Sequence, residues 1–106
     1  MKKIGIGLLG LGTVGSGVAS IINTPFGRHP LVSQLALIRV AVRDLKRKRD
    51  LAFSESILTS NPSEVIDDPS VHIVVEVIGG IEPARSLIIQ AIRAGKSVVT
   101  ANKAVI

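Results

Sequence analysis

Mostly apolar runs alternate with helix-like segments along the whole chain. Five of these runs predict short strands covered on both faces, at residues 4–9, 35–42, 57–59, 72–78 and 97–100. Helical spacing of apolar residues predicts two longer helices, at 13–23 and 83–94, with a brief helix capped by Asn61 and ended at 67–69. This order predicts an α/β domain, a doubly wound parallel sheet with right-handed crossovers and helices on both faces.

The two longer helices each have a predicted buried side. In the first, the apolar residues that share one side are Val14, Val18, Ile21 and Ile22, with Gly15 and Ala19 allowing close approach to the sheet. In the second, the apolar side consists of Ala84, Leu87, Ile88, Ala91 and Ile92. The first helix is expected to end at Thr24-Pro25 and the second at Gly95, since these residues stop helices.

The composition narrows the class of protein. Hydrophobic residues make up 46% of the 106, yet two Phe are the only aromatic residues, so we expect one domain with an aliphatic core. The absence of Cys excludes disulfides, thiolate metal sites and Cys nucleophiles. His29 and His72 lack metal-ligand spacing, so we expect no metal site and assign both a structural or exposed role.

The start of the chain and its charge exclude further classes. The apolar residues 4–9 are interrupted by glycines and no small-residue cleavage site follows, which argues against a signal peptide. No apolar run approaches the ~20 residues that span a bilayer, so we expect a soluble, cytoplasmic protein without a membrane partner. The net charge of +5 is concentrated at 43–49 without interleaved aromatics, which favours a phosphorylated small molecule over nucleic acid.

The motif Gly10-Leu11-Gly12-Thr13-Val14-Gly15 lies between the first predicted strand and the first predicted helix. In this position Gly10 permits a tight turn, Gly12 lets the backbone approach a pyrophosphate, and Gly15 lets helix and strand pack closely. The helix N-terminus offers free N–H groups and a positive dipole to phosphates. The motif therefore predicts a Rossmann-type dinucleotide-binding domain, with a Gly-rich turn that binds no ligand as the alternative.

The residues after the second predicted strand bear on the choice of cofactor. Arg43 follows the strand directly, and a guanidinium there can take the 2′-phosphate of NADP bidentately. Asp44 is the competing candidate for the ribose 2′-hydroxyl of NAD. The Lys and Arg residues after position 45 could also form only a solvated charged face. The sequence thus favours NADP and leaves NAD open.

Two further segments leave strands at the same edge of the sheet, where ligands bind in open parallel sheets. Gly79 and Gly80 let the backbone lie against the adenine-side ribose or the nicotinamide half, although a plain turn is nearly as consistent with them. Glu76 lies inside its strand and is expected to be satisfied by a partner or to lie at an edge position, rather than to act as an acid. Thr100 leads to Lys103, whose ammonium could hold a substrate oxygen and relay a proton or simply lie at the surface.

The sequence resembles the N-terminal, cofactor-binding part of homoserine dehydrogenase over nearly its whole length. The resemblance rests on residues 7–18, 42–44, 75–84 and 95–104. The first block is shared by many dehydrogenases, whereas the last two are more particular to this family. Those two blocks favour a functional Lys103 over a surface lysine.

The resemblance implies a reversible NAD(P)-dependent interconversion of L-homoserine and L-aspartate 4-semialdehyde, in threonine and methionine biosynthesis. It implies that Thr13 and Val14 contact the cofactor, that Arg43 binds the adenosine phosphate, and that Lys103 is catalytic beside nicotinamide and substrate. Motifs and resemblance together give the expected cofactor-binding set: Gly10, Gly12, Thr13, Val14, Gly15, Arg43, Gly79, Gly80, Thr100 and Lys103.

Members of the family continue into a substrate-binding and dimerising region, with further active-site residues. We therefore expect residues 1–106 to be a truncated dinucleotide-binding domain, either an excised piece or a shortened reading frame, that is inactive alone. The full-length enzyme is expected to be a homodimer. The alternative function is a non-catalytic nucleotide-sensing domain or cofactor-binding subunit.

Overall fold

The chain alternates strands and helices in the predicted order. The structure, a computed structural model, describes residues 3–102. Its strands are β1 (Ile4–Leu9), β2 (Leu35–Ala41), β3 (Leu58–Thr59), β4 (Ile73–Glu76) and β5 (Ser97–Thr100). Its helices are α1 (Thr13–Asn23), α2 (Pro62–Ile66) and α3 (Ala84–Arg93), with short 3-10 helices η1 (Pro30–Gln34) and η2 (Glu55–Ile57).

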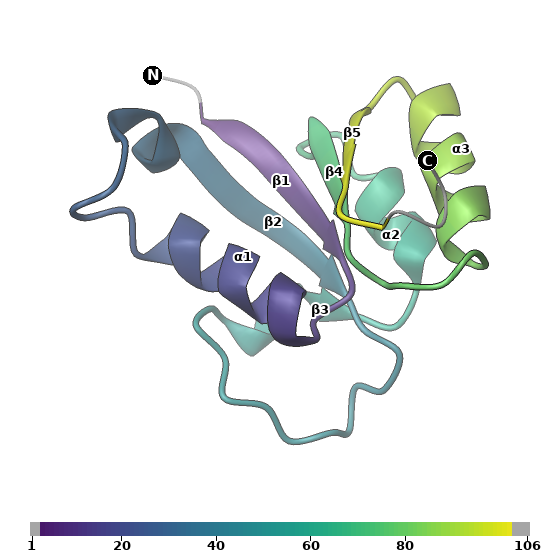
Figure 1. Ribbon diagram of the computed structural model, residues 1–106, viewed down its shortest axis with the longest axis horizontal. Helices are drawn as coiled ribbons and strands as arrows, with labels where there is room; N and C mark the ends of the chain where they lie inside the picture. Colours follow the sequence, from purple (N-terminus) through teal and green to yellow (C-terminus); the bar gives the residue numbers. More distant parts are fainter. Residues whose placement is uncertain (1–2, 103–106) are drawn as a thin grey trace.

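The five strands form one parallel sheet in the order β3-β2-β1-β4-β5. The chain builds outward from β1 through β2 to β3 and then returns to the other side of β1, where β4 and β5 follow (Figure 1). The strand order therefore reverses between β1 and β4. In open parallel sheets such a switch point, beyond the carboxyl ends of the strands, is where ligands bind.

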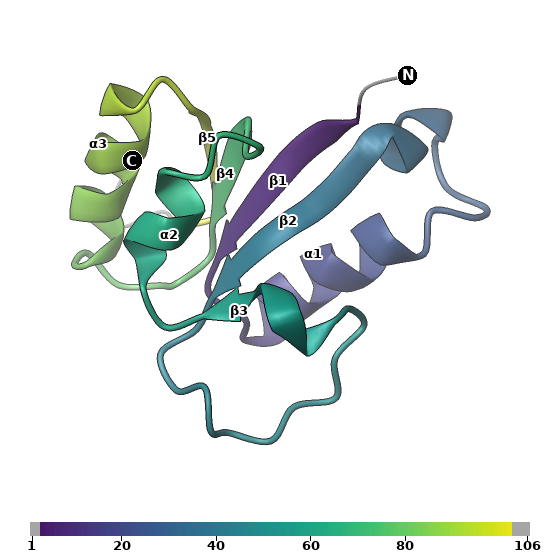
Figure 2. The same cartoon turned by 180° about the vertical axis from the view of Figure 1, so that it is seen from behind.

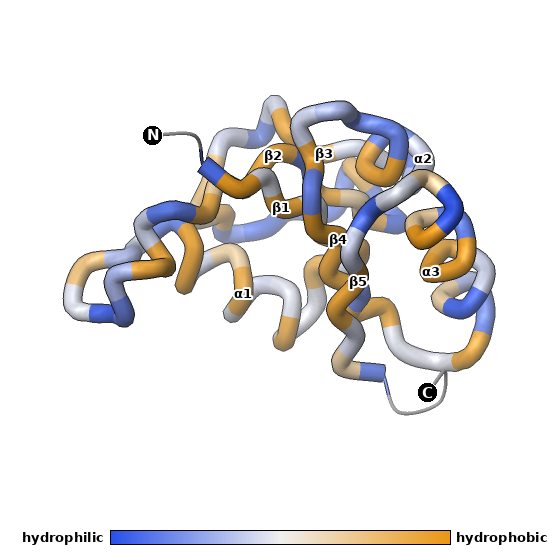
Figure 3. The backbone as a smooth tube through the Cα atoms, turned by 90° about the horizontal axis from the view of Figure 1, so that it is seen from above, coloured by the Kyte–Doolittle hydropathy of each residue, from blue (hydrophilic) through white to orange (hydrophobic). Residues whose placement is uncertain are grey.

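Helices cover both faces of the sheet, as expected. The helix α1 lies against one face, and α2 and α3 lie against the other (Figures 1 and 2). Neighbouring residues of β1 supply the two halves of the core, since Leu8 packs in the α1-side cluster and Leu9 in the cluster of the opposite face. Both are fully buried. The hydropathy map accordingly concentrates hydrophobic colour along the strands between these helices (Figure 3).

The predicted element bounds are correct to within one or two residues. The helix at 13–23 and the strands at 4–9 and 97–100 have the predicted bounds, and Asn61 caps α2 by accepting a 3.0 Å hydrogen bond from the backbone N–H of Ser63. The strand predicted at 72–78 is shorter, at Ile73–Glu76, and beyond its end the Glu76 side chain accepts a hydrogen bond from the backbone N–H of Ile78. The strands predicted at 35–42 and 57–59 and the helix at 83–94 are also slightly shorter.

The predicted inner side of α1 was partly wrong. Val14 and Ile21 are 56% and 42% exposed, whereas the buried residues of the helix are Gly15, Ala19 and Ile22. The reason is close packing: a side chain at Gly15 would collide with the backbone of Gly10, so the helix presents its small residues to the turn and the sheet.

The same preference for small residues appears in α3. Ala84 and Ala91 are fully buried there, while Ile92, which was predicted to face the core, is 60% exposed. Among the described residues, no helix is long and apolar enough to cross a membrane.

Candidate functional site

The Gly-rich turn connects the carboxyl end of β1 to the start of α1. Gly10 has a φ of +101°, a conformation that favours glycine, and its N–H donates a 2.9 Å hydrogen bond to the carbonyl of Ala41. A Cβ at Gly10 would lie 3.1 Å from the carbonyl oxygen of Val77, at the end of β4. Gly10 therefore makes the tight turn that the motif predicts, wedged between the ends of β2 and β4.

Gly12 and Gly15 differ in what surrounds them. A Cβ at Gly15 would lie 2.4 Å from the carbonyl oxygen of Gly10, so this position has to be glycine for α1 to pack here. A Cβ at Gly12 would meet no described atom within 4 Å. Glycine at position 12 is thus not required by packing, and its bare backbone borders open space where another molecule can approach.

The first turn of α1 adds an electrostatic preference for an anion. Within residues 3–102, no side chain caps this helix, and its first turn contains no acidic residue. The first backbone N–H groups of a helix lack intrahelical partners, and they lie at the positive end of the helix dipole. Open backbone at Gly12 beside such an uncapped N-terminus fits a phosphate group of a dinucleotide.

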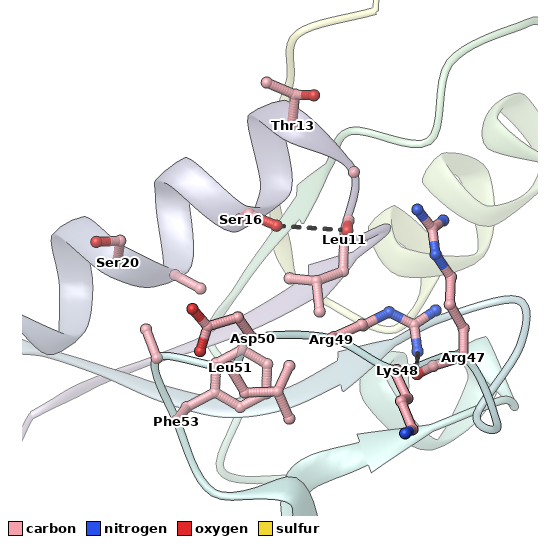
Figure 4. A pocket seen from close by; sticks show the side chains of 13 residues that line it. Leu11, Thr13, Ser16, Ser20, Arg47, Lys48, Arg49, Asp50, Leu51 and Phe53 are labelled. Carbon is pink, nitrogen blue, oxygen red and sulfur yellow. Dashed lines mark hydrogen bonds between the residues drawn. The ribbon is translucent and has the colours of Figure 1, made fainter.

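Two cavities adjoin this turn. The first, here the edge cavity, has a volume of about 540 Å³ and lies at the carboxyl ends of β1, β2 and β4, lined among others by Gly10, Gly12, Arg43, Arg47, Arg49, Val77 and Ile78. The second, here the side cavity, has a volume of about 590 Å³ and lies between α1 and residues 47–53 (Figure 4). Thr13, Ser16 and Ser20 line it from the helix.

Arginines connect the two cavities. Arg47 and Arg49 line both, whereas Arg43 is exposed and lines the edge cavity. Arg49 also holds the basic loop together, because its Nη1 donates to the backbone carbonyls of Asp44 at 2.7 Å and Arg47 at 3.2 Å. The sequence predicted a cluster of cations after β2 but did not indicate which of them lie near the phosphate site. The path of the loop is what brings two of them, Arg47 and Arg49, to both cavities.

Asp44, the competing candidate for an NAD-type contact, lines neither cavity. Its Oδ1 accepts a 2.9 Å hydrogen bond from the backbone N–H of Lys46 and so shapes its own loop.

Several predicted site residues lie apart from the two cavities. Val14 is exposed on the outer side of α1, and Gly79 and Gly80 are exposed with φ of +87° and +75°. Thr100 is half-buried and donates from its hydroxyl to Oε1 of Glu76. Lys103 lies outside the described residues.

Glu76 is a residue whose role the sequence did not reveal. It is fully buried, with Oε2 accepting from the backbone N–H of Ile78 at 2.7 Å and Oε1 accepting from Thr100 at 2.5 Å. The expectation that it is satisfied by partners is confirmed, but nothing in the sequence indicated that those partners lie at the ends of two different strands, β4 and β5. An ionisable residue in an otherwise apolar strand run is the signal that could have found it.

Both histidines have structural contacts. The Nδ1 of His72 accepts a 2.8 Å hydrogen bond from the N–H of Gly5, and that of His29 accepts one of 3.1 Å from the N–H of Leu31. Among residues 3–102, no three metal-ligating side chains gather at one point.

The switch point, the Gly-rich turn ahead of α1 and the arginines around it define a dinucleotide-binding α/β domain of the Rossmann type. Comparison with known proteins is more specific. Residues 10–106 match the family model described as "Homoserine dehydrogenase, NAD binding domain", and the chain belongs to this family. The resemblance noted from the sequence motifs is confirmed.

The relatives are much longer than this chain. It is 52% identical to the homoserine dehydrogenase of Synechocystis over 101 residues, which are 95% of this chain and 23% of that protein. It is 46% identical to the Bacillus subtilis enzyme of the same name over 105 residues, which are 97% of this chain and 24% of that protein. The chain thus spans about a quarter of the length of these relatives.

A solved structure supports the same fold. The crystal structure of S. aureus homoserine dehydrogenase at pH 8.5 matches with a TM-score of 0.84 and 45% identity, covering 97% of this chain and 26% of that one. The predicted Rossmann-type architecture is confirmed by this match and by the sheet order.

Proposed function

We propose that this chain holds the nicotinamide dinucleotide for a homoserine dehydrogenase. The whole enzyme would interconvert L-homoserine and L-aspartate 4-semialdehyde by hydride transfer, in threonine and methionine biosynthesis. The family membership and the names of the relatives support this reaction. Residues 1–106 match about a quarter of the length of those relatives, so we expect these residues by themselves to bind cofactor without turnover.

The observation that carries the proposal is the open backbone of Gly12 at the uncapped start of α1. There Gly10, Gly12, Thr13, Val14 and Gly15 would hold the pyrophosphate with backbone groups. The edge cavity continues from Gly12 toward the end of β2, which suits the adenosine half. The strands β4 and β5 lie on the other side of β1, which suits the nicotinamide half.

NADP is the proposed preferred cofactor, with NAD as the alternative. Arg43 lines the edge cavity at the end of β2, where the 2′-phosphate of an adenosine half would lie. Arg47 and Arg49 line the same cavity and add positive charge. Asp44, whose carboxylate would favour NAD, bonds to its own loop.

The residues at the ends of β4 and β5 would serve the reacting half. When bound, the nicotinamide ring supplies or accepts the hydride. Gly79, Gly80 and Thr100 would border that half, and Lys103 would bind the substrate oxygen and ease movement of its proton. A homodimer in the cytoplasm is the proposed setting of the full-length enzyme.

Titration calorimetry with NADP and NAD tests the proposal. The wild-type chain should bind in a saturable way, and Gly12→Val should abolish or sharply weaken binding because its side chain fills the space beside the turn. Gly17→Val is the matched control: its Cβ also meets no described atom within 4 Å, but Gly17 lines neither cavity. A wild-type chain that binds neither NADP nor NAD would refute the proposed function.

A further inference from the structure

One buried carboxylate ties together two loops that the proposed function places beside the nicotinamide half of the cofactor. Glu76 is the last residue of β4 and is fully buried. We infer that Glu76 is a positioning residue, which holds the loop after β4 and the segment after β5 in the arrangement that receives that half. The inference rests on the proposed function and deepens it.

The hydrogen bonds run in one direction toward the carboxylate. The backbone N–H of Asn102 donates to the Thr100 hydroxyl at 2.9 Å, and that hydroxyl donates to Oε1 of Glu76 at 2.5 Å. From the other side, the N–H of Ile78 donates to Oε2 at 2.7 Å. One oxygen therefore holds the segment after β5, and the other holds the loop after β4.

Backbone contacts reinforce the same connection. The carbonyl of Glu76 accepts from the N–H of Ala101 at 3.3 Å, and the side-chain amide of Asn102 donates to the carbonyl of Gly80. A Cβ added at Gly79 or Gly80 would meet no described atom within 4 Å, so side-chain packing does not fix this pair of glycines. The hydrogen bond from Asn102 to Gly80 therefore connects the 79–80 turn directly to the segment after β5.

Packing alone does not explain a carboxylate at this position. The preceding strand residue on the same face of the sheet is the fully buried Val74, within the apolar cluster beneath α2 and α3. Burying a carboxylate costs free energy unless hydrogen bonds compensate it, and an apolar residue would avoid that cost. The carboxylate adds two acceptor oxygens, one bonded to the loop after β4 and the other to the end of β5. Hydrogen bonds of this kind are how a supporting residue fixes the geometry of a binding site.

The test compares binding of NADP with binding of adenosine 2′,5′-bisphosphate, which lacks the nicotinamide half. Glu76→Gln keeps the volume of the side chain but removes its charge and replaces one acceptor oxygen with a donor NH₂. The Thr100 hydroxyl then accepts from this NH₂ instead of donating to a carboxylate, so the charge-assisted bond on the β5 side is lost. We expect calorimetry on the 106-residue chain to show NADP affinity reduced about tenfold, the effect of one hydrogen bond to a charged group. Affinity for adenosine 2′,5′-bisphosphate should remain unchanged.

A second pair of variants tests the same bonds from the side of β5. Thr100→Val removes the hydroxyl and should reproduce the selective loss, whereas Thr100→Ser keeps the hydroxyl and should lose much less affinity for NADP than Thr100→Val. This pair decides the matter if Glu76→Gln does not fold.

The outcomes separate this inference from the proposed function. Equal weakening of both ligands, or weakening of neither, would overturn the positioning role while leaving cofactor binding intact. Failure of the wild type to bind either ligand would overturn the proposed function and this inference with it.

Discussion

Two alanine substitutions in the same helix should change stability in opposite directions. In Gly15→Ala the new Cβ would lie 2.4 Å from the carbonyl oxygen of Gly10. This oxygen belongs to the backbone and cannot turn aside as a flexible side chain could. The helix α1 therefore has to move until the distance between the two atoms exceeds 3.0 Å. Overpacking of this kind costs about 3 kcal/mol at the upper end, offset by about 1 kcal/mol of helix propensity gained over glycine. The net loss is therefore about 2 kcal/mol.

Gly17→Ala has the same chemistry without the collision, because a Cβ at Gly17 meets no described atom within 4 Å. It should gain about 1 kcal/mol. Since about 1 kcal/mol moves the Tm of a domain of this size by roughly 4–8 °C, thermal unfolding followed by circular dichroism should place Gly15→Ala roughly 8–16 °C below the wild type and Gly17→Ala roughly 4–8 °C above it. A Gly15→Ala chain that melts at or above the wild-type temperature would refute the close-packing account of the turn.

Three further outcomes are expected. Arg43→Ala should weaken NADP binding about tenfold or more and NAD binding little, because it removes a charge-assisted contact, and equal losses in calorimetry would make Arg43 structural. In a full-length enzyme, Lys103→Ala should reduce kcat by orders of magnitude without unfolding the protein, and near-normal turnover would leave it a surface lysine. Hydrogen bonds from Thr59 and Arg39 lower the pKa of Glu64. The stability that the Glu64 carboxylate contributes is therefore present at neutral pH and lost as the pH falls through that lowered pKa. In Glu64→Gln the acid side of the plot of Tm against pH should flatten.

Local signals explain why much of the fold was predictable. The Gly-rich turn and the Thr24-Pro25 pair bracket α1 with residues whose backbone preferences are strong, so the bounds of this helix were correct. The rotation of the helix was not predictable in the same way. It carries apolar residues on more than one side, and the contact between Gly15 and Gly10, which periodicity does not contain, decides which side turns inward.

The site was predictable where it depends on backbone and unpredictable where it depends on loops. Glycines at positions 10, 12 and 15 have the surroundings that their motif implies. The contribution of Arg47 and Arg49 to both cavities follows from the path of residues 44–49, which have no periodic pattern. The two partners of Glu76 come from different strand ends, so only the sheet order could bring them together.

The central claim is that the turn at Gly12 and the arginines beside it receive a dinucleotide. The most direct measurement is a ¹⁵N–¹H NMR titration of the chain with NADP, which reports on each backbone amide separately. We predict saturable shifts with one common Kd, largest at the amides of residues 10–15 and at Arg43, and small at the distant 3-10 helix η1. Shifts absent from the Gly-rich turn, or largest on a surface away from both cavities, would contradict the account.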